Sequence, residues 1–382
     1  MNKIFSLSII AAASLAVFSS CDTNVDLTAP YASTTVVFGL LDPQADTQFV
    51  KITKTFLGDG NLNDYAMIRD SSEYKWEEFS SLHIEVYATG NPDAIDTLFL
   101  QPITIQNKDV NGIFYGPEQT VYYFPTPVGG LNTGRKYKLV ADFVSRPDVF
   151  AWTDVIPTSN FNFSNLQSQS GNIPGLNLAG TISGSVNYKD VTLYWYPVDN
   201  AEIYDLSLRF YYTEKTYYDD QLTQLASTSD KFIDWKIGTY NTEDINNLLG
   251  QFEASFNSES FYSFLGNNLI ANPRVRREAG HFDGIRTIAF ELRMGFANDE
   301  LRTWLNVNNP VTGIIQERPN YTNVVGGLGL FASRARYVKS NMPLLNNSTP
   351  ANGNINALMN GDYTIDLNFC DPNPNNSPYS CN

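Results

Sequence analysis

Residues 82–88, LHIEVYA, place an apolar side chain at every second position. A period of two directs successive side chains to opposite faces, and it predicts a β-strand with one face in a hydrophobic core. Residues 136–144 repeat the pattern, with Tyr137 and Leu139 on one face. These two stretches predict a sheet with one buried face.

Further short strand signals surround these two and are separated by turn residues. Gly116-Pro117 and Gly129-Gly130 mark two of the turns. The remaining apolar or β-branched stretches are residues 34–41, 49–56, 97–100, 113–115 and 121–124. About seven short strands with such turns predict a β-sandwich over residues 34–157.

The second half of the chain predicts a more elaborate β domain. A polar linker over residues 158–178 leads into residues 179–345, where alternating segments predict strands at 203–212 and 285–296. We also expect three helices here, at 242–249, 258–269 and 298–307, the last with Leu301, Trp304 and Leu305 directed inward. The predicted fold class is mainly β, with two sandwiches and about three helices in the second.

The size and charge of the chain exclude several functional classes. Its 382 residues exceed the roughly 250–300 at which one hydrophobic core stops growing. The formal net charge is −15, which argues against a nucleic-acid partner, because such proteins need a basic face. The same charge argues against docking onto anionic lipid.

Residues 1–20 resemble a secretory signal peptide, with Lys3 before an apolar stretch over 4–18. Phe18-Ser19-Ser20-Cys21 resembles the lipobox of bacterial lipoproteins, which implies lipidation of Cys21 and a tether over residues 21–33. Asp22 and Asp26 resemble the surface-export signal of Bacteroidota lipoproteins. The resemblance implies an outer-membrane anchor and favours the cell surface over the periplasmic face.

Two stretches resemble fibronectin type III and immunoglobulin-like domains. Residues 131–139, LNTGRKYKL, resemble the tyrosine corner, in which the hydroxyl of Tyr137 would bond back to the chain. Residues 191–204, VTLYWYPVDNAEIY, place Trp195, a proline turn and Tyr204 in the order of that family. The resemblance implies a buried tryptophan in the second domain.

Residues 38–61 and 307–331, together with the lipobox, resemble a group of uncharacterised Bacteroidota outer-membrane lipoproteins. Some members of that group are associated with TonB-dependent transporters. The resemblance implies an accessory role, and the family has no established activity to carry over to this chain. The stretch Gly326-Gly327-Leu328-Gly329 lacks the spacing of a phosphate-binding loop and predicts a turn with positive φ before a strand at 330–338.

The C-terminal tail, residues 346–382, contains Cys370 and Cys381, which an oxidising compartment would allow to pair. Asp371, Asn373 and Asn375 have a spacing found in calcium loops, but no glutamate closes the loop. These residue types are also turn formers. We therefore expect a disulfide-closed tail and no metal.

Two other sites are suggested by short patterns. Arg274, Arg276 and Arg277 form a basic segment that would meet an acidic partner or phosphate, or pair with local carboxylates such as Glu278. Asp96-Thr97-Leu98 matches the short O-glycosylation motif that Bacteroidota use on exported proteins, with Thr97 as the acceptor.

No sequence motif supports catalysis or a cofactor. His83 and His281 accompany no nucleophile motif, and no HExxH or CxxC is present. We therefore expect a non-enzymatic accessory lipoprotein that binds an outer-membrane protein. The alternative is a surface lipoprotein that binds glycans on exposed aromatic rings. A coplanar exposed pair of rings would favour the glycan, and a broad exposed apolar patch would favour the protein partner.

Overall fold

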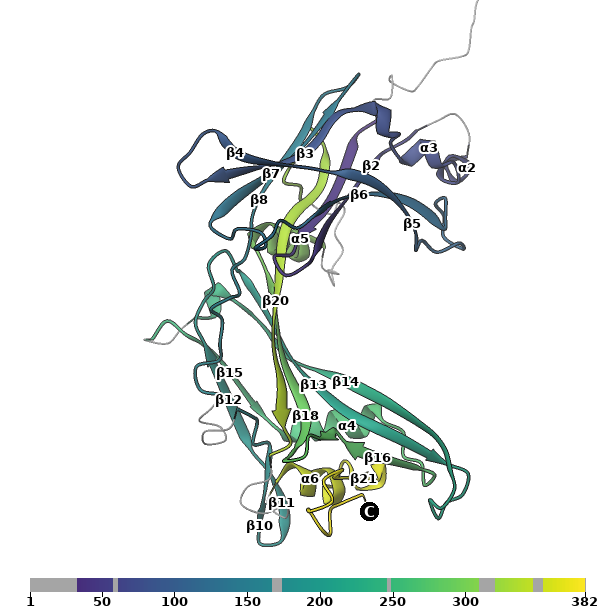
Figure 1. Ribbon diagram of the computed structural model, residues 1–382, viewed down its shortest axis with the longest axis vertical. Coiled ribbons are helices and arrows are strands. Elements are labelled where there is room, and N and C mark those ends of the chain that lie inside the picture. Colours follow the sequence, from purple (N-terminus) through teal and green to yellow (C-terminus); the bar gives the residue numbers. More distant parts are fainter. Residues whose placement is uncertain are drawn as a thin grey trace, which may run out of the picture.

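The computed structural model describes residues 33–57, 61–166, 174–245, 249–308, 320–345 and 353–381. Its fold is mainly β with several sheets, which confirms the prediction of a β-rich, sandwich-type fold. Figure 1 shows an upper and a lower group of strands connected by the long strand β20. The predicted signal peptide and Cys21 lie outside the described residues.

The upper group is a sandwich of two sheets. One sheet is the β20-β1-β2-β6-β5 part of an 11-stranded sheet that continues into the lower group. The other is a 5-stranded sheet with the order β19-β8-β7-β3-β4. The strand bounds of the first are β1 Thr35–Leu41, β2 Thr47–Lys54, β5 Gln101–Gln106, β6 Glu118–Pro125 and β20 Leu328–Pro343. Those of the second are β3 Phe79–Ala88, β4 Ala94–Phe99, β7 Arg135–Phe143, β8 Val149–Asp154 and β19 Val324–Val325.

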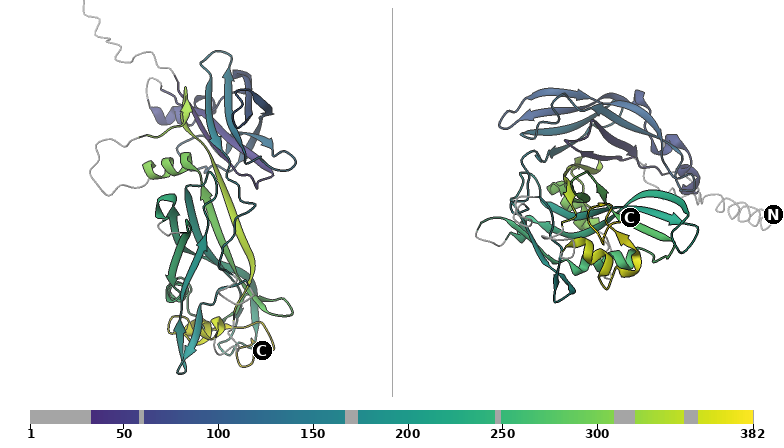
Figure 2. Two further views of the ribbon diagram at one scale, coloured as in Figure 1. Left: turned by 90° about the vertical axis from the view of Figure 1, so that its left-hand side faces the viewer. Right: turned by 60° about the horizontal axis from the view of Figure 1, so that its bottom comes forward.

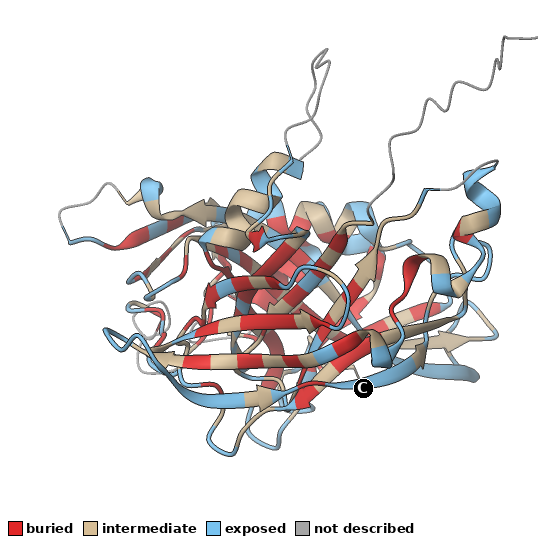
Figure 3. Cartoon of the chain, turned by 90° about the horizontal axis from the view of Figure 1, so that it is seen from above, coloured by how far each residue is buried: buried red, intermediate tan, exposed pale blue. Residues whose placement is uncertain are grey.

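Alternation explains this sandwich, as Figure 3 shows by the banding of buried and exposed residues along its strands. Ile84 of β3 and Leu139 of β7 are a cross-strand pair, and both are buried in the core. Val37 and Val50 contribute from the facing sheet. Successive side chains of a strand point to opposite faces of its sheet. The neighbours of these buried residues in the chain therefore face outward.

The lower group is built around long strands of the largest sheet. These are β13 Ile203–Tyr217, β14 Leu225–Asn241, β16 Val275–Ala279, β17 His281–Phe282, β18 Thr287–Ala297 and β21 Phe369–Cys370. Two pairs, β10 Ala179–Ile182 with β11 Ser185–Tyr188 and β12 Asp190–Trp195 with β15 Phe252–Asn257, complete the described strands. A second, separate hydrophobic core lies between the β12-β15 pair and the long strands β13 and β18.

Strand β20 belongs to both groups. Its first part, Leu328–Ser333, pairs in parallel with β1, and its second part, Arg334–Pro343, pairs antiparallel with β18. Phe331 is buried in the upper core and Met342 in the lower one. Residues 324–333 therefore complete the first sandwich, although the sequence pattern assigned them to the second.

Short helices occupy the connections. They are α2 Leu62–Ala66, α3 Arg69–Ser72, α4 Glu259–Asn268, α5 Asp299–Asn308 and α6 Asn354–Asn360, with 3-10 turns at η1 Trp76–Glu78, η2 Thr242–Asp244 and η4 Ile365–Leu367. The helices predicted at 258–269 and 298–307 are present as α4 and α5. Of the helix predicted at 242–249, the described residues form only the turn η2, and 246–248 lie outside the description.

One predicted strand is wrong, and several strands were missed, among them β5, β8 and β14. Residues 113–115 form no strand, because the backbone N–H of Tyr115 donates to the carbonyl of Ala66 instead of to a neighbouring strand. Strand β5 was missed because Pro102 interrupts its pattern. Proline is tolerated there because β5 is the edge strand of its sheet.

The predicted tyrosine corner and the predicted tryptophan core are both present. The Tyr137 hydroxyl donates to the carbonyl of Asn132 at 3.2 Å. Trp195 is fully buried on β12, and its ring stacks on Phe252 at 5.3 Å between centroids. The Tyr204 hydroxyl accepts from the backbone N–H of Val198 at 2.7 Å, which anchors the start of β13 in the same way.

The tail packs against the lower core (Figure 2) and is closed by a disulfide between Cys370 and Cys381. Asp371 is fully buried and accepts hydrogen bonds from Thr287, Asn373 and Asn376, so it serves the turn. The described residues hold no group of three or more His, Cys, Asp or Glu side chains suited to a metal. No described helix is long and apolar enough to cross a membrane.

Candidate functional site

The outer face of the β1-β2-β6 sheet carries exposed aromatic rings. Phe38 of β1 is 46% exposed and Phe49 of β2 is 50% exposed. Their positions follow from the alternation that buries Val37 and Val50, their neighbours in the chain. Tyr123 of β6 lies beside Phe49, with ring centroids 6.2 Å apart. The rings of Phe38, Phe49 and Tyr123 therefore lie together on the outer face of one sheet.

Helix α5 extends this face. Asn298 caps the helix, because its side-chain oxygen accepts from the N–H of Leu301 at 3.3 Å. The buried amide of Asn298 also donates to Thr153 at 2.8 Å, which ties the helix to β8. The Trp304 ring then contacts Phe38 edge-on, with centroids 6.4 Å apart. We call Phe38, Phe49, Tyr123, Leu301 and Trp304 the aromatic surface.

The expected inward direction of the α5 side chains is wrong. No residue of α5 is buried, and Leu305 is 37% exposed. The helix packs on β20 and Phe38, outside both hydrophobic cores, so its apolar side lines surface hollows instead. Leu301 and Arg334 line two such hollows, of about 400 and 620 Å³, on the two sides of the helix.

Charged groups surround the aromatic surface and mostly pair with one another. Arg334 lies 3.8 Å from Asp42, and its side chain is 60% exposed. Lys236 lies 2.8 Å from Asp205 at the far side of the larger hollow. The aromatic surface thus has an apolar centre and a charged rim, which is the composition of protein interfaces.

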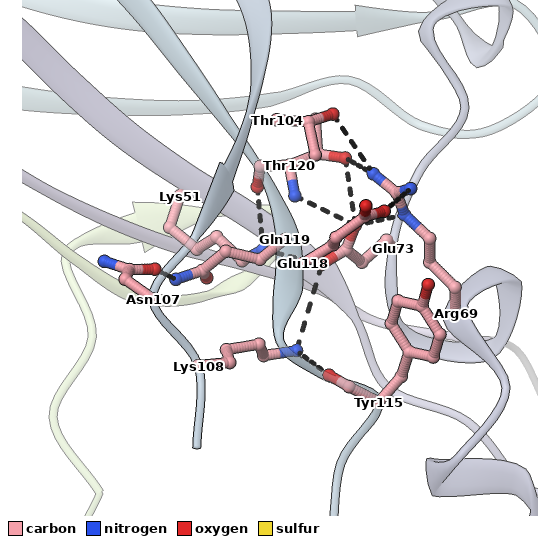
Figure 4. A network of polar contacts seen from close by, with 10 residues as sticks. All are labelled: Lys51, Arg69, Glu73, Thr104, Asn107, Lys108, Tyr115, Glu118, Gln119 and Thr120. Carbon is pink, nitrogen blue, oxygen red and sulfur yellow. Dashed lines mark hydrogen bonds and ion pairs between the residues drawn. The ribbon is translucent and has the colours of Figure 1, made fainter. Parts of the chain in front are cut away.

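Lys51 links the aromatic surface to a buried polar network, drawn in Figure 4. Its ammonium donates to Glu73 at 3.0 Å, and Arg69 donates to the same carboxylate at 3.0 Å. The backbone N–H and the hydroxyl of Thr120 donate to it at 3.0 and 2.9 Å. Burial raises the pKa of Glu73, but the hydrogen bonds from Lys51 and Thr120 outweigh burial and hold the pKa below its ordinary value.

Lys108 completes the network by joining a loop to it. Its ammonium donates to the carbonyl of Tyr115 at 2.9 Å and lies 3.9 Å from Glu73. The network therefore holds α3, β2, β6 and the loop before β6 around one carboxylate. A carboxylate with this many donors positions backbone segments, and here two of these segments, β2 and β6, belong to the sheet that carries the aromatic surface.

A second carboxyl group, that of Glu300 in the first turn of α5, has a pKa shifted in the opposite direction. Burial raises the pKa of Glu300 to about 7, and the negative charges of Asp154 and Asp299 add to the rise, while Lys136 opposes it. A group whose folded pKa lies above its unfolded value of about 4.5 makes the folded chain less stable as the pH rises from about 4.5 to 7.

We therefore expect Glu300→Gln to raise the free energy of unfolding by about 2 kcal/mol at pH 8, and by less than about half of that at pH 5. Urea unfolding at the two pH values measures the difference. The matched control is Glu243→Gln, whose side chain is 85% exposed and should show no pH-dependent gain. An equal shift of Glu300→Gln at both pH values would contradict the assignment.

The arginine segment does not form one free basic patch. Arg277 is only 3% exposed, and it pairs with Glu214 at 3.1 Å and donates to the carbonyl of Leu367 at 2.8 Å. Arg274 points away and pairs with Asp220 at 2.6 Å. Arg276 is half-buried between them on β16. Strand alternation puts Arg276 and Arg277 on opposite faces of β16, and the ion pairs of Arg274 and Arg277 agree with pairing to nearby carboxylates rather than with a joint partner contact.

The other predicted sites lie apart from the aromatic surface. Thr97 is exposed on the edge strand β4 of the second sheet of the upper sandwich, as an acceptor of a glycan requires. Cys370 and Cys381 lie in the tail of the lower group. Sequence reasoning missed the aromatic surface. A signal for it was present, because Phe38 and Phe49 alternate with buried valines and must therefore point away from the core.

No protein-family model matches the chain, and no curated protein matches its sequence. The resemblance of residues 38–61 and 307–331 to Bacteroidota lipoproteins therefore stays a prediction. Parts of both stretches, residues 58–60 and 309–319, lie outside the described residues. Function is inferred from the surfaces that the structure describes.

Proposed function

We propose that this chain is a lipid-anchored, non-enzymatic binding module of the outer membrane, exposed at the cell surface, whose aromatic surface contacts an outer-membrane protein such as a TonB-dependent transporter. The anchor is Cys21, and the tether over residues 21–33 carries the folded part. A tethered module gains effective concentration near membrane partners, so a modest interface suffices.

The observation that supports this function is the aromatic centre formed by the exposed rings of Phe38 and Phe49 and the half-buried ring of Trp304. Aromatic residues and arginine are enriched in protein interfaces, and a few of them provide most of the binding energy. Arg334 supplies the arginine at the border between the two hollows. The buried network at Glu73 ties β2 and β6 of this sheet to α3, and an interface ordered before binding has a lower entropic cost.

The ring geometry of this surface favours a protein over a glycan. Phe49 and Tyr123 are inclined by 36°, and Phe38 and Trp304 by 83°. A sugar chain stacks best on rings that share a plane, whereas the side chains of a protein partner fill spaces between inclined rings. Two functions were predicted from the sequence, binding of a protein and binding of a glycan. The aromatic surface suits binding of a protein better.

Crosslinking in live cells, followed by mass spectrometry, tests this function. In the full-length chain, the pair of changes Phe49→Ala and Trp304→Ala should reduce the crosslink to an integral outer-membrane protein by about tenfold. Phe99→Ala, which removes an equally large ring that is 66% exposed on β4, should leave the crosslink unchanged. Cys21→Ser, which lacks the lipidated residue, should give no such crosslink.

Two results would overturn the proposal. One is an unchanged crosslink in the Phe49→Ala, Trp304→Ala chain. The other is recovery of the wild-type protein without any membrane partner, together with saturable glycan binding that the same two changes abolish.

A further inference from the structure

A separate hollow of about 330 Å³ lies between the 3-10 turn η1 and the edge of the β5-β6 hairpin. We call it the Trp76 pocket, and its principal lining residues are Arg69, Lys75, Trp76, Pro102, Thr104 and Tyr122. Its volume is at the lower end of small-molecule sites, which suits a ligand of about one ring. The aromatic surface does not share these residues.

An exposed indole is the first feature that points to a ligand. Trp76 is 42% exposed, although tryptophan is highly buried on average. Its ring lies 6.2 Å from that of Tyr122 and is inclined by only 29°, so the buried tyrosine supports the indole from within. Trp76 also contacts Phe79 of the core, which fixes its position. The indole is therefore a rigid platform that is partly open to solvent.

A buried hydroxyl without a partner is the second feature. Tyr122 is fully buried and lines the pocket, and its hydroxyl makes no hydrogen bond within the described part of the chain. Most buried hydroxyl groups are hydrogen-bonded, so an orphan one beside a hollow has hydrogen-bonding capacity left for a polar group that enters from outside. The hydroxyl can donate and accept, which matches another hydroxyl group.

The neighbouring polar groups are already oriented. Arg69 is held by Glu73 at 3.0 Å and by the hydroxyl of Thr120 at 2.8 Å, and it approaches Thr104 at 3.5 Å. At the rim, Lys75 pairs with Asp70 at 2.8 Å, and both side chains are more than half exposed. These groups combine donors and acceptors at fixed positions.

The charge of the pocket excludes strongly anionic ligands. The basic lining residues are Arg69 and Lys75, and the acidic ones are Asp70, Glu73 and Glu77. Because both bases are paired with carboxylates, no free positive charge remains among them for a phosphate or a uronic acid. A ligand must instead be neutral, rich in hydroxyl groups, and apolar on one face.

We propose that the Trp76 pocket binds one ring of a neutral sugar. The electron-rich face of the indole attracts the polarised C–H groups of one sugar face. The hydroxyl groups at the ring edge exchange hydrogen bonds with Tyr122, Thr104 and the Asp70–Lys75 pair. This site is independent of the proposed protein partner, because it uses a different surface and a different chemistry.

The test is a calorimetric titration of the full chain with maltohexaose, cellohexaose, xylohexaose and mannohexaose, and with hexagalacturonate as the anionic counterpart. We expect saturable binding of at least one neutral hexasaccharide and none of hexagalacturonate. Trp76→Ala should weaken binding by about tenfold or more, and Trp76→Phe should retain most of it. Trp152→Ala is the matched control, because this tryptophan is 38% exposed on the other sheet.

Three results would overturn the proposal. They are the absence of saturable binding with all four neutral sugars, equal affinity of Trp76→Ala and wild type, and binding of hexagalacturonate as tight as that of the neutral sugars. If the alanine variant loses its fold, the preference for neutral hexasaccharides over hexagalacturonate carries the test. The Phe49→Ala, Trp304→Ala chain should bind sugar normally, so failure of the partner proposal leaves this one standing.

Discussion

Gly329→Ala is expected to lower the free energy of unfolding by about 3 kcal/mol, because two penalties coincide at this position. Its φ is +111°, which side chains rarely adopt. A Cβ there would also lie 1.9 Å from the carbonyl oxygen of Val37, the residue that Gly329 faces on β1. The substitution must therefore break the parallel pairing of β1 with β20.

Urea unfolding monitored by circular dichroism measures the loss. The matched control is Gly90→Ala, because Gly90 also has a positive φ, +78°, but no atom lies within 4 Å of its Cβ position. That variant should lose only about 1 kcal/mol. Equal losses in the two variants would show that the β1-β20 contact is not as close as described.

Glu73→Gln is expected to cost about 3 kcal/mol, which is the usual result of breaking a buried ion pair. The amide keeps the shape of the side chain but removes the charge that Lys51 and Arg69 share. It also offers an N–H group where the wild type offers only acceptors to Thr120. We expect α3 and the loop before β6 to lose protection from hydrogen exchange first.

Glu118→Gln is the control for this prediction, because Glu118 pairs with the same Arg69 at 3.5 Å but its side chain is 37% exposed. An exposed pair of this kind contributes only about 0–1 kcal/mol. The pH dependence gives a further check. The folded pKa of Glu73 is depressed, so its stabilisation is present above the unfolded pKa and is lost as the pH falls through the folded pKa.

The wild type should therefore lose stability in acid more steeply than Glu73→Gln does. A Glu73→Gln chain that unfolds at the wild-type urea concentration at neutral pH would contradict the role of this network. Parallel acid profiles of the two proteins would contradict the pKa assignment while leaving the network intact.

Local sequence patterns were sufficient for much of the fold. Strand patterns located about half of the described strands, and the corner at Tyr137 and the buried Trp195 followed from residue types in a recognisable order. The turn with positive φ at Gly326 and the pairing of Cys370 with Cys381 are also present. Each of these features depends on residues close together in the chain, where backbone geometry leaves few alternatives.

The candidate sites were decided at longer range. Alternation shows that Phe38 and Val37 face opposite ways, but it does not show that Phe38 stays 46% exposed beside the ring of Trp304. The Trp76 pocket exists because η1 lies against the β5-β6 hairpin. Strand β5 was not predicted, because Pro102 interrupts its alternating pattern.

The sequence by itself determined the mainly β class, the strand faces and the local turns, because these follow from side-chain periodicity and from the φ preferences of glycine and proline. Only the tertiary structure decided that β20 serves two cores, that Arg277 is buried against Glu214, and that α5 lies outside both cores. The physical reason is that strand pairing and burial depend on partners far apart in the chain. Such partners compete with many others of similar hydrophobicity, and only packing of the whole chain selects among them.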